Sequence, residues 1–573
     1  MINVKIEGKS YQFEEGLTIL EATKKAGFNV PTLCYYKNLV DSASCRVCLV
    51  EVKGARTLVT SCNTIINEGM EISINSERAY EARRKSVKLL LSNHINECTS
   101  CKANGKCELQ SVAKILGIEA NDFPGSKTER TIDIVSPTIQ RDTGKCILCG
   151  RCIEACKKYQ GIGILAFQKR GFKTIVGPAE NRSFSEVPCM YCGQCVNVCP
   201  TGALSVKEEY LNILKAKKEG KFMIAQAAPA VRAALGEEFG FPIGTAVTGK
   251  MIASLRKLGF DRVFDVNFGA DLTIMEEHTE LIERIKNGGK LPMITSCSPG
   301  WVRYCEFFYP ELIKNLSTCK SPNMMQAAII KSYFAKKHNL KPEDIYLVSV
   351  MPCSAKKYEN IRDEMEFNLD CVITTRELAE FIKGSGIDFN NLEDEQWDND
   401  LLGEYSGAGV IFGASGGVME AALRTAYHTL TGKDYEEVIF PQVRAESGIK
   451  EATIEIDGIK LNVAVASSMH YAKPLLEDIK KGTSKYHFIE IMGCPSGCIN
   501  GGGQPFVKND PDYINKRRKA LYNEDERNKI RFSYKNPDII KLYEDYLGKP
   551  CGEKSHHLLH TKYFKKEKYP DKK

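Results

Sequence analysis

Grouped cysteines are the residues of this chain whose type and spacing most clearly suit chemistry. Fifteen of the 23 cysteines precede residue 200, and they stand in four groups that each contain the pair C-x2-C. Two thiolates separated by two residues can reach one metal ion or cluster from a single loop. In a long chain such groups are typical of metal binding, whereas disulfide frameworks are typical of short secreted domains. We therefore expect four metal-binding groups before residue 200.

The first two groups are a set of four thiols and a set of three thiols with one imidazole. They consist of Cys34, Cys45, Cys48 and Cys62, and of His94, Cys98, Cys101 and Cys107. The spacing of the first set and its strand-rich surroundings resemble a plant-type [2Fe–2S] ferredoxin, and a [4Fe–4S] cluster is expected on the second. An imidazole in place of one thiolate leaves a cluster less negative, which is one way of setting its potential. Zinc uses the same ligands and stays an alternative for both groups.

The other two groups form an internal repeat of the pattern C-x2-C-x2-C-x3-C, and Pro200 follows the second copy. The pattern matches bacterial two-cluster ferredoxins, in which the fourth cysteine of each run binds the cluster of the other run. One [4Fe–4S] cluster is therefore expected on Cys146, Cys149, Cys152 and Cys199, and another on Cys156, Cys189, Cys192 and Cys195. A series of such clusters suits the movement of single electrons between a surface partner and a buried site.

Three further cysteine loops lie far apart in the second half of the chain. They are TSCSPGW at 295–301, MPCSAK at 351–356 and EIMGCPSGCINGGGQP at 490–505. Each follows an apolar run that is typical of a β-strand, and loops at strand ends are where α/β folds gather ligands. We therefore expect the three loops to meet at one site.

The patterning of the chain predicts a multidomain protein of α+β and α/β structure. In the first 75 residues short strands alternate with turns, and from about residue 210 helical periods alternate with β-rich runs. Predicted strands cover residues 4–6, 11–13, 49–52, 222–225, 345–350 and 488–491, and predicted helices cover residues 19–26 and 77–93.

Composition limits the class of protein further. Hydrophobic residues make up 43% of the chain and charged residues 26%, which is typical of a soluble globular protein. No apolar stretch approaches the roughly 20 residues of a membrane span, and the N-terminus has no signal-peptide core. The net charge of +7 is modest and mostly spread along the chain, so nucleic-acid binding is not expected. These observations predict a cytoplasmic protein without a membrane span.

Together the motifs resemble those of the long monomeric clostridial type of [FeFe]-hydrogenase, and the resemblance covers the whole chain. It implies a β-grasp [2Fe–2S] ferredoxin-like domain over residues 1–78, a His/Cys3 cluster domain over 79–125 and a bacterial 2[4Fe–4S] ferredoxin-like domain over 126–209. A large α/β catalytic domain would follow over residues 210–573, with 520–573 as a wrapping C-terminal segment that resembles the family's small subunit.

In that family the catalytic H-cluster is a [4Fe–4S] cluster joined to a two-iron centre that carries CO, cyanide and an azadithiolate. The resemblance makes Cys353, Cys494 and Cys498 cluster ligands, with Cys498 bridging to the two-iron centre. It also makes Lys356 the cation that holds a cyanide. The walls of the pocket would be Ala228, Pro229, Ser321, Pro322, Met351 and Met492.

The resemblance further implies a proton path made of Cys297, Glu277, Ser317, Glu280 and Arg284. Glu277, Glu280 and Arg284 stand three and four residues apart, which places them on one face of a helix. Carboxylates and a hydroxyl can exchange protons over hydrogen-bond distances. The path would connect solvent with the two-iron centre.

The first loop departs from the family's pattern, which has two adjacent cysteines before the proline. In the pattern the first cysteine relays protons and the second binds the cluster, whereas here Cys297 is followed by Ser298. Ser298 could bind iron through oxygen, Cys297 could shift to supply the sulfur, or the fourth corner could be weakened. These three alternatives stay open. We expect binding to be retained because the other expected residues are present.

The predicted enzyme is a hydrogenase that catalyses 2H⁺ + 2e⁻ ⇌ H₂, with ferredoxin or a similar one-electron carrier as partner and maturation proteins that supply the H-cluster. Two other functions are an electron-transfer subunit of a larger complex, which the first 210 residues also resemble, and a low-turnover hydrogen sensor. The three cysteine loops argue against the first, and the lack of an appended signalling domain argues against the second.

Several remaining cysteines and histidines lack ligand spacing. Packing or structural roles are expected for Cys305, Cys319, Cys371, Cys551, His556, His557 and His560.

Overall fold

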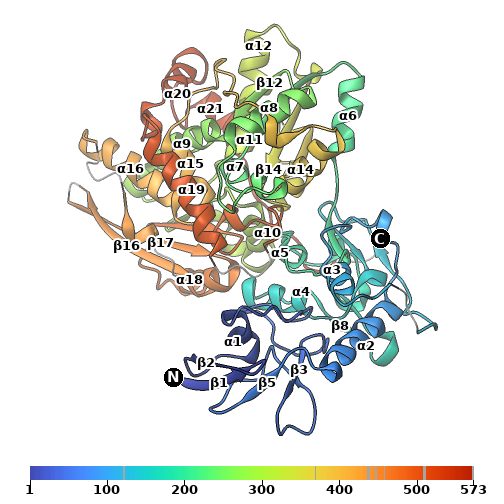
Figure 1. Cartoon of the computed structure of the whole chain (residues 1–573). Coiled ribbons are helices and arrows are strands. Elements are labelled where there is room, and N and C mark those ends of the chain that lie inside the picture. The colour runs from blue at the N-terminus through green and yellow to red at the C-terminus, as the bar shows by residue number, and fades with distance from the viewer. Residues whose placement is uncertain are drawn as a thin grey trace. The chain divides into compact units, whose positions relative to one another are not determined.

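A computed structural model of the chain describes residues 1–570 apart from 120–122, 368, 435–438, 445–447, 457 and 508–511. Backbone contacts divide the chain into two compact units. The first contains Met1–Val187 and Val198–Ser205, and the second contains Pro188–Asn197 and Val206–Lys573. Each unit has its own strands and core (Figure 1). The four domain boundaries expected from the sequence stay predictions.

The first unit begins with a sheet of strand order β2-β1-β5-β3-β4. β1 (Ile2–Ile6) and β2 (Lys9–Phe13) form an antiparallel hairpin, and β5 (Glu71–Ser73) lies parallel to β1. β3 (Leu49–Val52) and β4 (Val59–Thr60) complete the sheet. The side chains of β1 alternate between buried and exposed, as expected for a sheet that covers a core with one face. The three strands predicted in this part of the chain are confirmed.

Helices precede the cysteine loops of the first unit. α1 (Ile19–Lys25) begins with a capping box, in which Thr18 and Glu21 each accept the other's backbone N–H. α2 (Glu77–Asn93) has a serine N-cap and ends at His94, which is extended. Both helices were predicted from the sequence and are confirmed. The end of α2 thus places His94 at the start of the second cysteine group.

The remainder of the first unit consists of short elements between cysteine loops. β6 (Ile132–Asp133) pairs antiparallel with β7 (Ile139–Asp142), and β8 (Ala166–Gln168) pairs antiparallel with β9 (Ile175–Gly177). α3 (Glu108–Ile115) packs against α2. Because these elements are short, the loops between them make up much of the unit, and the loops carry the thiols.

The second unit contains a parallel sheet of order β12-β11-β14-β15. Its strands are β11 (Phe222–Ala227), β12 (Arg262–Asp265), β14 (Ile345–Met351) and β15 (Cys371–Thr374). β11 and β14 are buried along almost their whole length, which explains their continuous apolar sequences. The predictions of strands at 222–225 and 345–350 are confirmed.

A second sheet in the same unit has the order β13-β18-β17-β16. β18 (Phe488–Met492) lies parallel to β13 (Met293–Ile294) and to β17 (Ile459–Ser467), whereas β16 (Ile449–Ile456) is antiparallel to β17. The strand predicted at 488–491 is confirmed. The first cysteine loop follows β13, the second follows β14 and the third follows β18, so all three leave the carboxyl ends of parallel strands.

Long helices surround these strand ends. α9 (Val266–Lys286) is buried along most of its first four turns and contacts α11 (Pro322–Ile329) and α16 (Gly417–Thr431). Figure 1 shows the C-terminal helices, coloured red, beside α9 and α15 (Gly407–Val410). No helix in the described parts of the chain combines the length and the apolar character that a membrane span needs.

Buried ion pairs fix the C-terminal segment to the rest of the second unit. Arg517, on α19 (Tyr513–Arg527), donates to both carboxylate oxygens of Glu237 at 2.7 and 2.6 Å. Asp525, on the same helix, accepts from Arg424 at 3.2 and 3.0 Å. Arg517, Arg424 and Asp525 are almost fully buried. Such charges need their partners, so this segment is an integral part of the unit.

Candidate active site

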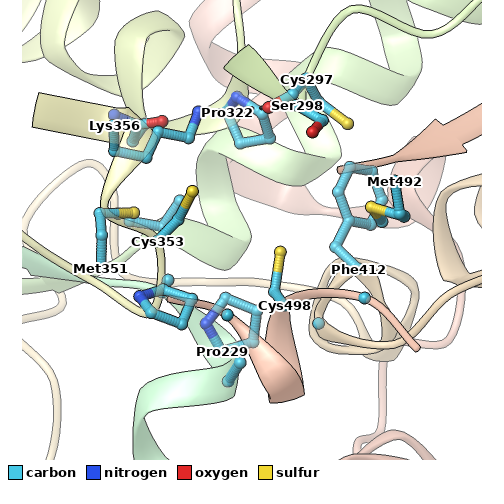
Figure 2. Close-up of a pocket in the computed structure, with 18 of the residues that line it drawn as sticks. Pro229, Cys297, Ser298, Pro322, Met351, Cys353, Lys356, Phe412, Met492 and Cys498 are labelled. Carbon is cyan, nitrogen blue, oxygen red and sulfur yellow. Dashed lines mark hydrogen bonds between the residues drawn. The ribbon is translucent and has the colours of Figure 1, made fainter. Parts of the chain in front are cut away.

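The three cysteine loops of the second unit meet at one cavity. Cys297 and Ser298 come from the first loop, Cys353 from the second, and Cys494 and Cys498 from the third, and all five residues line it. Figure 2 shows the sulfur atoms of Cys353 and Cys498 pointing into this space. The structure therefore brings together loops that are almost 200 residues apart in the sequence.

The thiols of the cavity are in surroundings that disfavour a free thiolate. Burial raises the pKa of Cys353 and raises that of Cys498 to about 12. Burial also raises the pKa of Cys494, and the charges of Cys353 and Cys498 add to the effect. A buried thiolate requires a metal or a cation beside it. Three sulfurs that face one cavity therefore fit the ligand set of an iron–sulfur cluster.

Lys356 supplies a cation to the same cavity. Its Nζ donates to the Glu359 carboxylate at 2.8 Å and to the backbone oxygen of Cys297 at 3.2 Å. The charge of Lys356 lowers the pKa of Cys353 and Cys498 against the larger effect of burial. Because the side chain is 9% exposed, this charge acts in a poorly solvated space. An anionic ligand inside the cavity would be stabilised by it.

Glycines allow the third loop to lie against its neighbours. A Cβ on Gly501 would lie 2.2 Å from the backbone oxygen of Pro352, and one on Gly502 would lie 2.2 Å from that of Cys192. Gly497 has a φ of +94°, which only glycine adopts readily. The glycines thus hold Cys494 and Cys498 close to the second loop.

The two side chains of the first loop have different neighbours. Ser298 precedes α10 (Pro299–Phe308) but makes no capping bond, and its Oγ accepts the N–H of Gly493 at 3.0 Å. This contact places the hydroxyl beside the residue that precedes Cys494. For Cys297, burial raises the pKa of the thiol, and the negative charge of Glu277 is the next largest influence. Ser298 thus lies next to the third cysteine loop, and Cys297 lies next to α9.

Glu277 lies on α9 and is 2% exposed. Burial raises its pKa to about 8, against a hydrogen bond with Ser317 that lowers it. The carboxyl is therefore protonated at neutral pH and can donate to the Ser317 hydroxyl. That hydroxyl donates in turn to Glu280 at 3.2 Å. A buried acid with such a pKa is suited to proton transfer near neutral pH.

Glu280 connects this chain of groups to the outer end of α9. Its carboxylate accepts from Arg284 at 2.5 Å, and the Arg284 side chain is 14% exposed. Arg284 is held by the backbone oxygen of Leu316 at 2.7 Å. Hydrogen bonds thus join Ser317, Glu280 and Arg284, and the charge of Glu277 acts on the thiol of Cys297. The proton path through these five residues stays a prediction.

The first three cysteines of the second copy of the repeat, Cys189, Cys192 and Cys195, belong to the same unit as the cavity. Gln194 donates to the backbone oxygen of Asn500 at 2.8 Å, and Asn197 donates to that of Gly501 at 3.1 Å. The charge of Cys494 raises the pKa of Cys192, after the larger effect of burial. Electrons on a cluster held by this run would therefore be adjacent to the cavity.

In the first unit, the four thiols of the first group are buried together. Cys34, Cys45, Cys48 and Cys62 are each less than 9% exposed. Cys34 interacts with Cys45, and Cys48 interacts with Cys62, while the charge of Cys34 acts on the second pair. The Cys34 N–H donates to the sulfur of Cys45 at 3.4 Å. N–H···S bonds of this kind are among the factors that set the potential of a cluster.

His94 has a buried ring nitrogen that lacks a protein partner. The residue is 7% exposed, and Nδ1 has no hydrogen bond among the described residues. Burial lowers the pKa of the imidazole to about 4, so the ring is neutral and its lone pair is available. An unsatisfied buried nitrogen of this kind fits a metal ligand. Cys101 and Cys107, from the same group, lie beside the 200–202 segment.

The quartet expected for the first [4Fe–4S] cluster lines a second cavity, which lies in the first unit. Its thiols are Cys146, Cys149, Cys152 and Cys199. The N–H of Leu148, a residue with φ of +55°, donates to Cys146 at 3.4 Å, and Tyr191 does the same for Cys189 in the second copy. The repeat is therefore a repeat of backbone geometry as well as of spacing. Cys156 belongs to the first unit, and its place in the other quartet stays a prediction.

Arg151 is a residue of the first unit that sequence reasoning missed. It is 1% exposed and donates to both carboxylate oxygens of Glu108 at 2.8 and 3.0 Å. It also donates to the backbone oxygens of Cys34 and Tyr35 at 3.5 and 2.9 Å. Its charge acts on the thiols of Cys149 and Cys199 and would offset negative charge on them. An arginine between Cys149 and Cys152 was the only signal in the sequence.

Comparison with known protein families matches all parts of the chain that carry these sites. Residues 221–502 match the iron only hydrogenase large subunit, C-terminal domain, and residues 511–566 match the iron hydrogenase small subunit. Residues 1–77 match a 2Fe-2S iron-sulfur cluster binding domain, and residues 145–203 match a 4Fe-4S dicluster domain. Residues 83–122 match the NADH-ubiquinone oxidoreductase-G iron-sulfur binding region.

The chain is 46% identical to the NADP-reducing hydrogenase subunit HndD of Solidesulfovibrio fructosivorans, over 99% of this chain and 100% of that one. It is 43% identical to iron hydrogenase 1 of Clostridium pasteurianum, with the same coverage. The chain belongs to the [FeFe]-hydrogenase family. A solved structure of the [FeFe]-hydrogenase HydA1 from Chlamydomonas reinhardtii is 43% identical, with a TM-score of 0.55, and covers 62% of this chain and 98% of its own.

This hydrogenase is an oxidoreductase that interconverts H₂ with protons and electrons and relays the electrons through iron–sulfur clusters. The predicted family, activity and enzyme class are confirmed. The fold is a mixed α/β multidomain fold with ferredoxin-like iron–sulfur domains and a hydrogenase catalytic domain.

The walls of the hydrogenase cavity include most of the residues expected there. Ala228, Pro229, Pro322, Met351 and Met492 line the cavity. Ser321 is buried but is absent from the lining; it directly precedes α11, and its hydroxyl donates to Asn323 at 3.0 Å. Phe412 and Val418 also line the cavity, and no sequence motif pointed to them.

Glu490 is a charged residue near the cavity to which the sequence motifs assigned no role. It is fully buried on β18 and accepts the N–H groups of Gly416 and Met419 at 2.7 and 2.8 Å. Its charge raises the pKa of both Cys297 and Glu277. A single carboxylate inside the apolar run FIEIM was the available signal.

Proposed function

We propose that the cavity holds the H-cluster, with Cys353, Cys494 and Cys498 on its [4Fe–4S] part and Cys498 bridging to the two-iron centre. The observation that supports this assignment is the convergence of three loop thiols and Lys356 on one cavity. When bound, the two-iron centre supplies the redox-active metal at which H₂ is cleaved or formed. Maturation proteins would supply its CO, cyanide and azadithiolate, because no side chain carries these groups.

We assign Ser298 as the fourth protein ligand of the [4Fe–4S] part. Its hydroxyl lies beside the loop of Cys494, and the N–H of Gly493 donates to it at 3.0 Å. A backbone N–H would stabilise negative charge on an oxygen ligand. Cys297 is then left for proton transfer, since Glu277 is the strongest charged influence on its thiol.

Protons would travel along α9 through groups that interact by charge or by hydrogen bonds. Glu277 exchanges a proton with Cys297 on one side and with Ser317 on the other. Ser317 passes it to Glu280, whose carboxylate is held by Arg284 near the surface. Each transfer is between a donor and an acceptor that the fold holds in place.

Electrons would reach the cavity through four accessory clusters. One [2Fe–2S] cluster would use Cys34, Cys45, Cys48 and Cys62, and three [4Fe–4S] clusters would use the His94 group and the two quartets of the repeat. The position of Cys192 beside Cys494 supports the last transfer of this series. The first domain would be a β-grasp ferredoxin domain, in keeping with its mixed sheet.

The electron partner would be ferredoxin or a similar one-electron carrier, and the enzyme a cytoplasmic monomer. A second candidate follows from the relative named as a subunit of an NADP-reducing hydrogenase. In that case this chain would pass electrons to another subunit, because it has no dinucleotide fingerprint G-x-G-x-x-G after a strand. The purified chain alone would then fail to reduce NADP⁺ under H₂ but would do so after its partner subunits are added.

A turnover assay with reduced viologen tests the proposed function. The matured protein should evolve H₂, and Cys498→Ala should abolish turnover. Cys305→Ala is the matched control, because Cys305 is fully buried in α10, away from the lining of the cavity. Equal turnover of the Cys498→Ala protein and the unaltered protein would refute the assignment of this cavity.

A further inference from the structure

His560, near the C-terminus, joins the carboxylates of α9 through hydrogen bonds. Its Nδ1 lies 2.7 Å from the Thr318 hydroxyl, and its Nε2 lies 3.0 Å from the carboxylate of Glu276. The Thr318 hydroxyl is also 3.1 Å from the carboxylate of Glu280. A continuous chain of polar groups therefore runs from Glu280 through Thr318 and His560 to Glu276.

The contacts of Glu276 identify it as an ionised acceptor. Its carboxylate accepts from the Tyr543 hydroxyl at 2.5 Å and from the Cys551 N–H at 2.7 Å. Although Glu276 is fully buried, these bonds and His560 lower the pKa of its carboxyl against the effect of burial. His560 Nε2 must then carry a hydrogen and donate it to Glu276.

The other nitrogen of His560 can either accept or donate a hydrogen bond. If Nδ1 accepts the Thr318 hydroxyl hydrogen, then Glu280 must carry a proton and donate it to the Thr318 oxygen. If Nδ1 carries a hydrogen, it donates to the Thr318 oxygen, and the Thr318 hydroxyl donates to an ionised Glu280. Every group is satisfied in both arrangements, and they differ only in whether Glu280 or His560 holds one proton.

We propose that Thr318 and His560 form a side branch of the proton path, on which His560 takes up and holds the proton that reaches Glu280. The proton of Glu280 moves to the Thr318 oxygen while the Thr318 hydroxyl proton moves to Nδ1 of His560, so no proton is gained or lost. His560 acts through Glu280 and is a positioning residue for the proton path. The inference rests on the proposed role of Glu280.

Several titratable groups surround His560. Glu276 and Glu280 face it from α9, while Cys319 comes from the loop before α11 and Cys551 from the C-terminal segment. Tyr543 donates its hydroxyl hydrogen to Glu276, which in turn contacts His560. The exposed ring of His556 stacks on that of His560, with 4.5 Å between the ring centroids. Two carboxylates therefore flank one imidazole that is 6% exposed.

The C-terminal segment is fixed in the position that this branch requires. The backbone N–H of Thr561 donates to the backbone oxygen of Thr318 at 2.8 Å, and the backbone N–H of Lys320 donates to the backbone oxygen of Leu559 at 2.8 Å. An isolated bridge pairs Cys319 with His560. The backbone bonds on both sides of His560 thus hold its ring against Thr318.

The test is the pH dependence of H₂ oxidation in the matured enzyme, with an oxidised viologen as acceptor. Protons leave along the path in this direction, so Glu280 must be ionised to accept them. His560→Gln removes the group that can take up the proton, and Thr318→Val removes the connecting hydroxyl. Each change should move the pH of half-maximal rate upward by about one unit, the effect of one hydrogen bond to a charged group.

Three controls separate the branch from a structural effect. Thr318→Ser keeps the hydroxyl and should restore the profile, and His556→Gln, at an exposed ring without these hydrogen bonds, should leave it unchanged. The double change at positions 318 and 560 should shift the profile no further than either single change, because both break the same chain. Additive shifts, or an unshifted profile in a folded His560→Gln enzyme, would overturn the proposal.

A parallel measurement on Glu277→Gln keeps the two hypotheses apart. If Glu277→Gln retains full rate, the proposed main path is wrong. If Glu277→Gln is inactive while His560→Gln and Thr318→Val keep the unaltered profile, the main path stands and the branch is wrong.

Discussion

Replacement of Glu277 by glutamine should have opposite effects on activity and stability. Glutamine has nearly the same shape and can still hydrogen-bond to Ser317, but it cannot release a proton. The carboxyl is 2% exposed and adjoins Cys297 on one side and Ser317 on the other. If it is an obligatory proton carrier, H₂ turnover should fall by about 10²–10⁴-fold, the usual contribution of such a group.

The stability effect follows from the direction of the pKa shift. Burial raises the pKa of Glu277 from 4.5 to about 8. Between these values the native state holds a proton that the unfolded state has lost, so the free energy of unfolding decreases as pH rises. At pH 7 the cost is about 3 kcal/mol, and below pH 4 it vanishes. Glu277→Gln removes this cost and should stabilise the second unit at pH 7 by up to that amount.

Thermal unfolding followed across a pH series measures the second effect. The difference in midpoint between Glu277→Gln and the unaltered protein should be small at pH 4 and should grow towards pH 8. Glu283→Gln is the matched control, because Glu283 lies on the same helix but is exposed, so no burial cost is removed. Unaltered turnover together with a midpoint difference that does not depend on pH would refute both arguments about Glu277.

Three other changes test separate parts of the account. Ser298→Cys should retain the [4Fe–4S] part of the H-cluster, and Ser298→Ala should lose much of it. Electron paramagnetic resonance of protein made without maturation proteins can measure this difference. Equal signals from both variants would exclude Ser298 as a ligand. His94→Cys should lower the potential of its cluster by roughly 100 mV or more, because a thiolate replaces a neutral imidazole, and a redox titration with an unchanged potential would contradict this. Asp265→Asn leaves the buried Arg232 without its 2.5 Å partner and should destabilise the second unit by about 3 kcal/mol. The half-exposed partner of Arg262, Asp400, is the control, and Asp400→Asn should change stability by less than about 1 kcal/mol in the same denaturation assay.

Local features of the sequence were sufficient to predict the secondary-structure elements and to single out the candidate ligand groups. Strand alternation and helix caps depend on residues a few positions apart, which is why β1, α1 and α2 were predicted closely. Cysteine spacing is local in the same sense, and the quartet of Cys146 and Cys199 followed from the repeat. The places of the three distant loops at strand ends predicted that they meet, and the family resemblance added the roles of their residues.

Contacts between distant segments could not be read from spacing. His560 and Thr318 are 242 residues apart, and only the pairing of the C-terminal segment with the loop before α11 brings them together. The interaction of Arg151 with Glu108 depends in the same way on how two short helices pack. The environment of Ser298 was equally open, because the position of Gly493 depends on the order of strands in the second sheet.

Infrared spectroscopy of the matured protein tests the central claim most directly, because the two-iron centre carries ligands that no other part of the molecule has. The account predicts CO and cyanide stretching bands in the unaltered protein, and their loss in Cys498→Ala while the accessory clusters remain. A fully iron-loaded, matured protein without these bands would contradict the assignment of the cavity between the three loops.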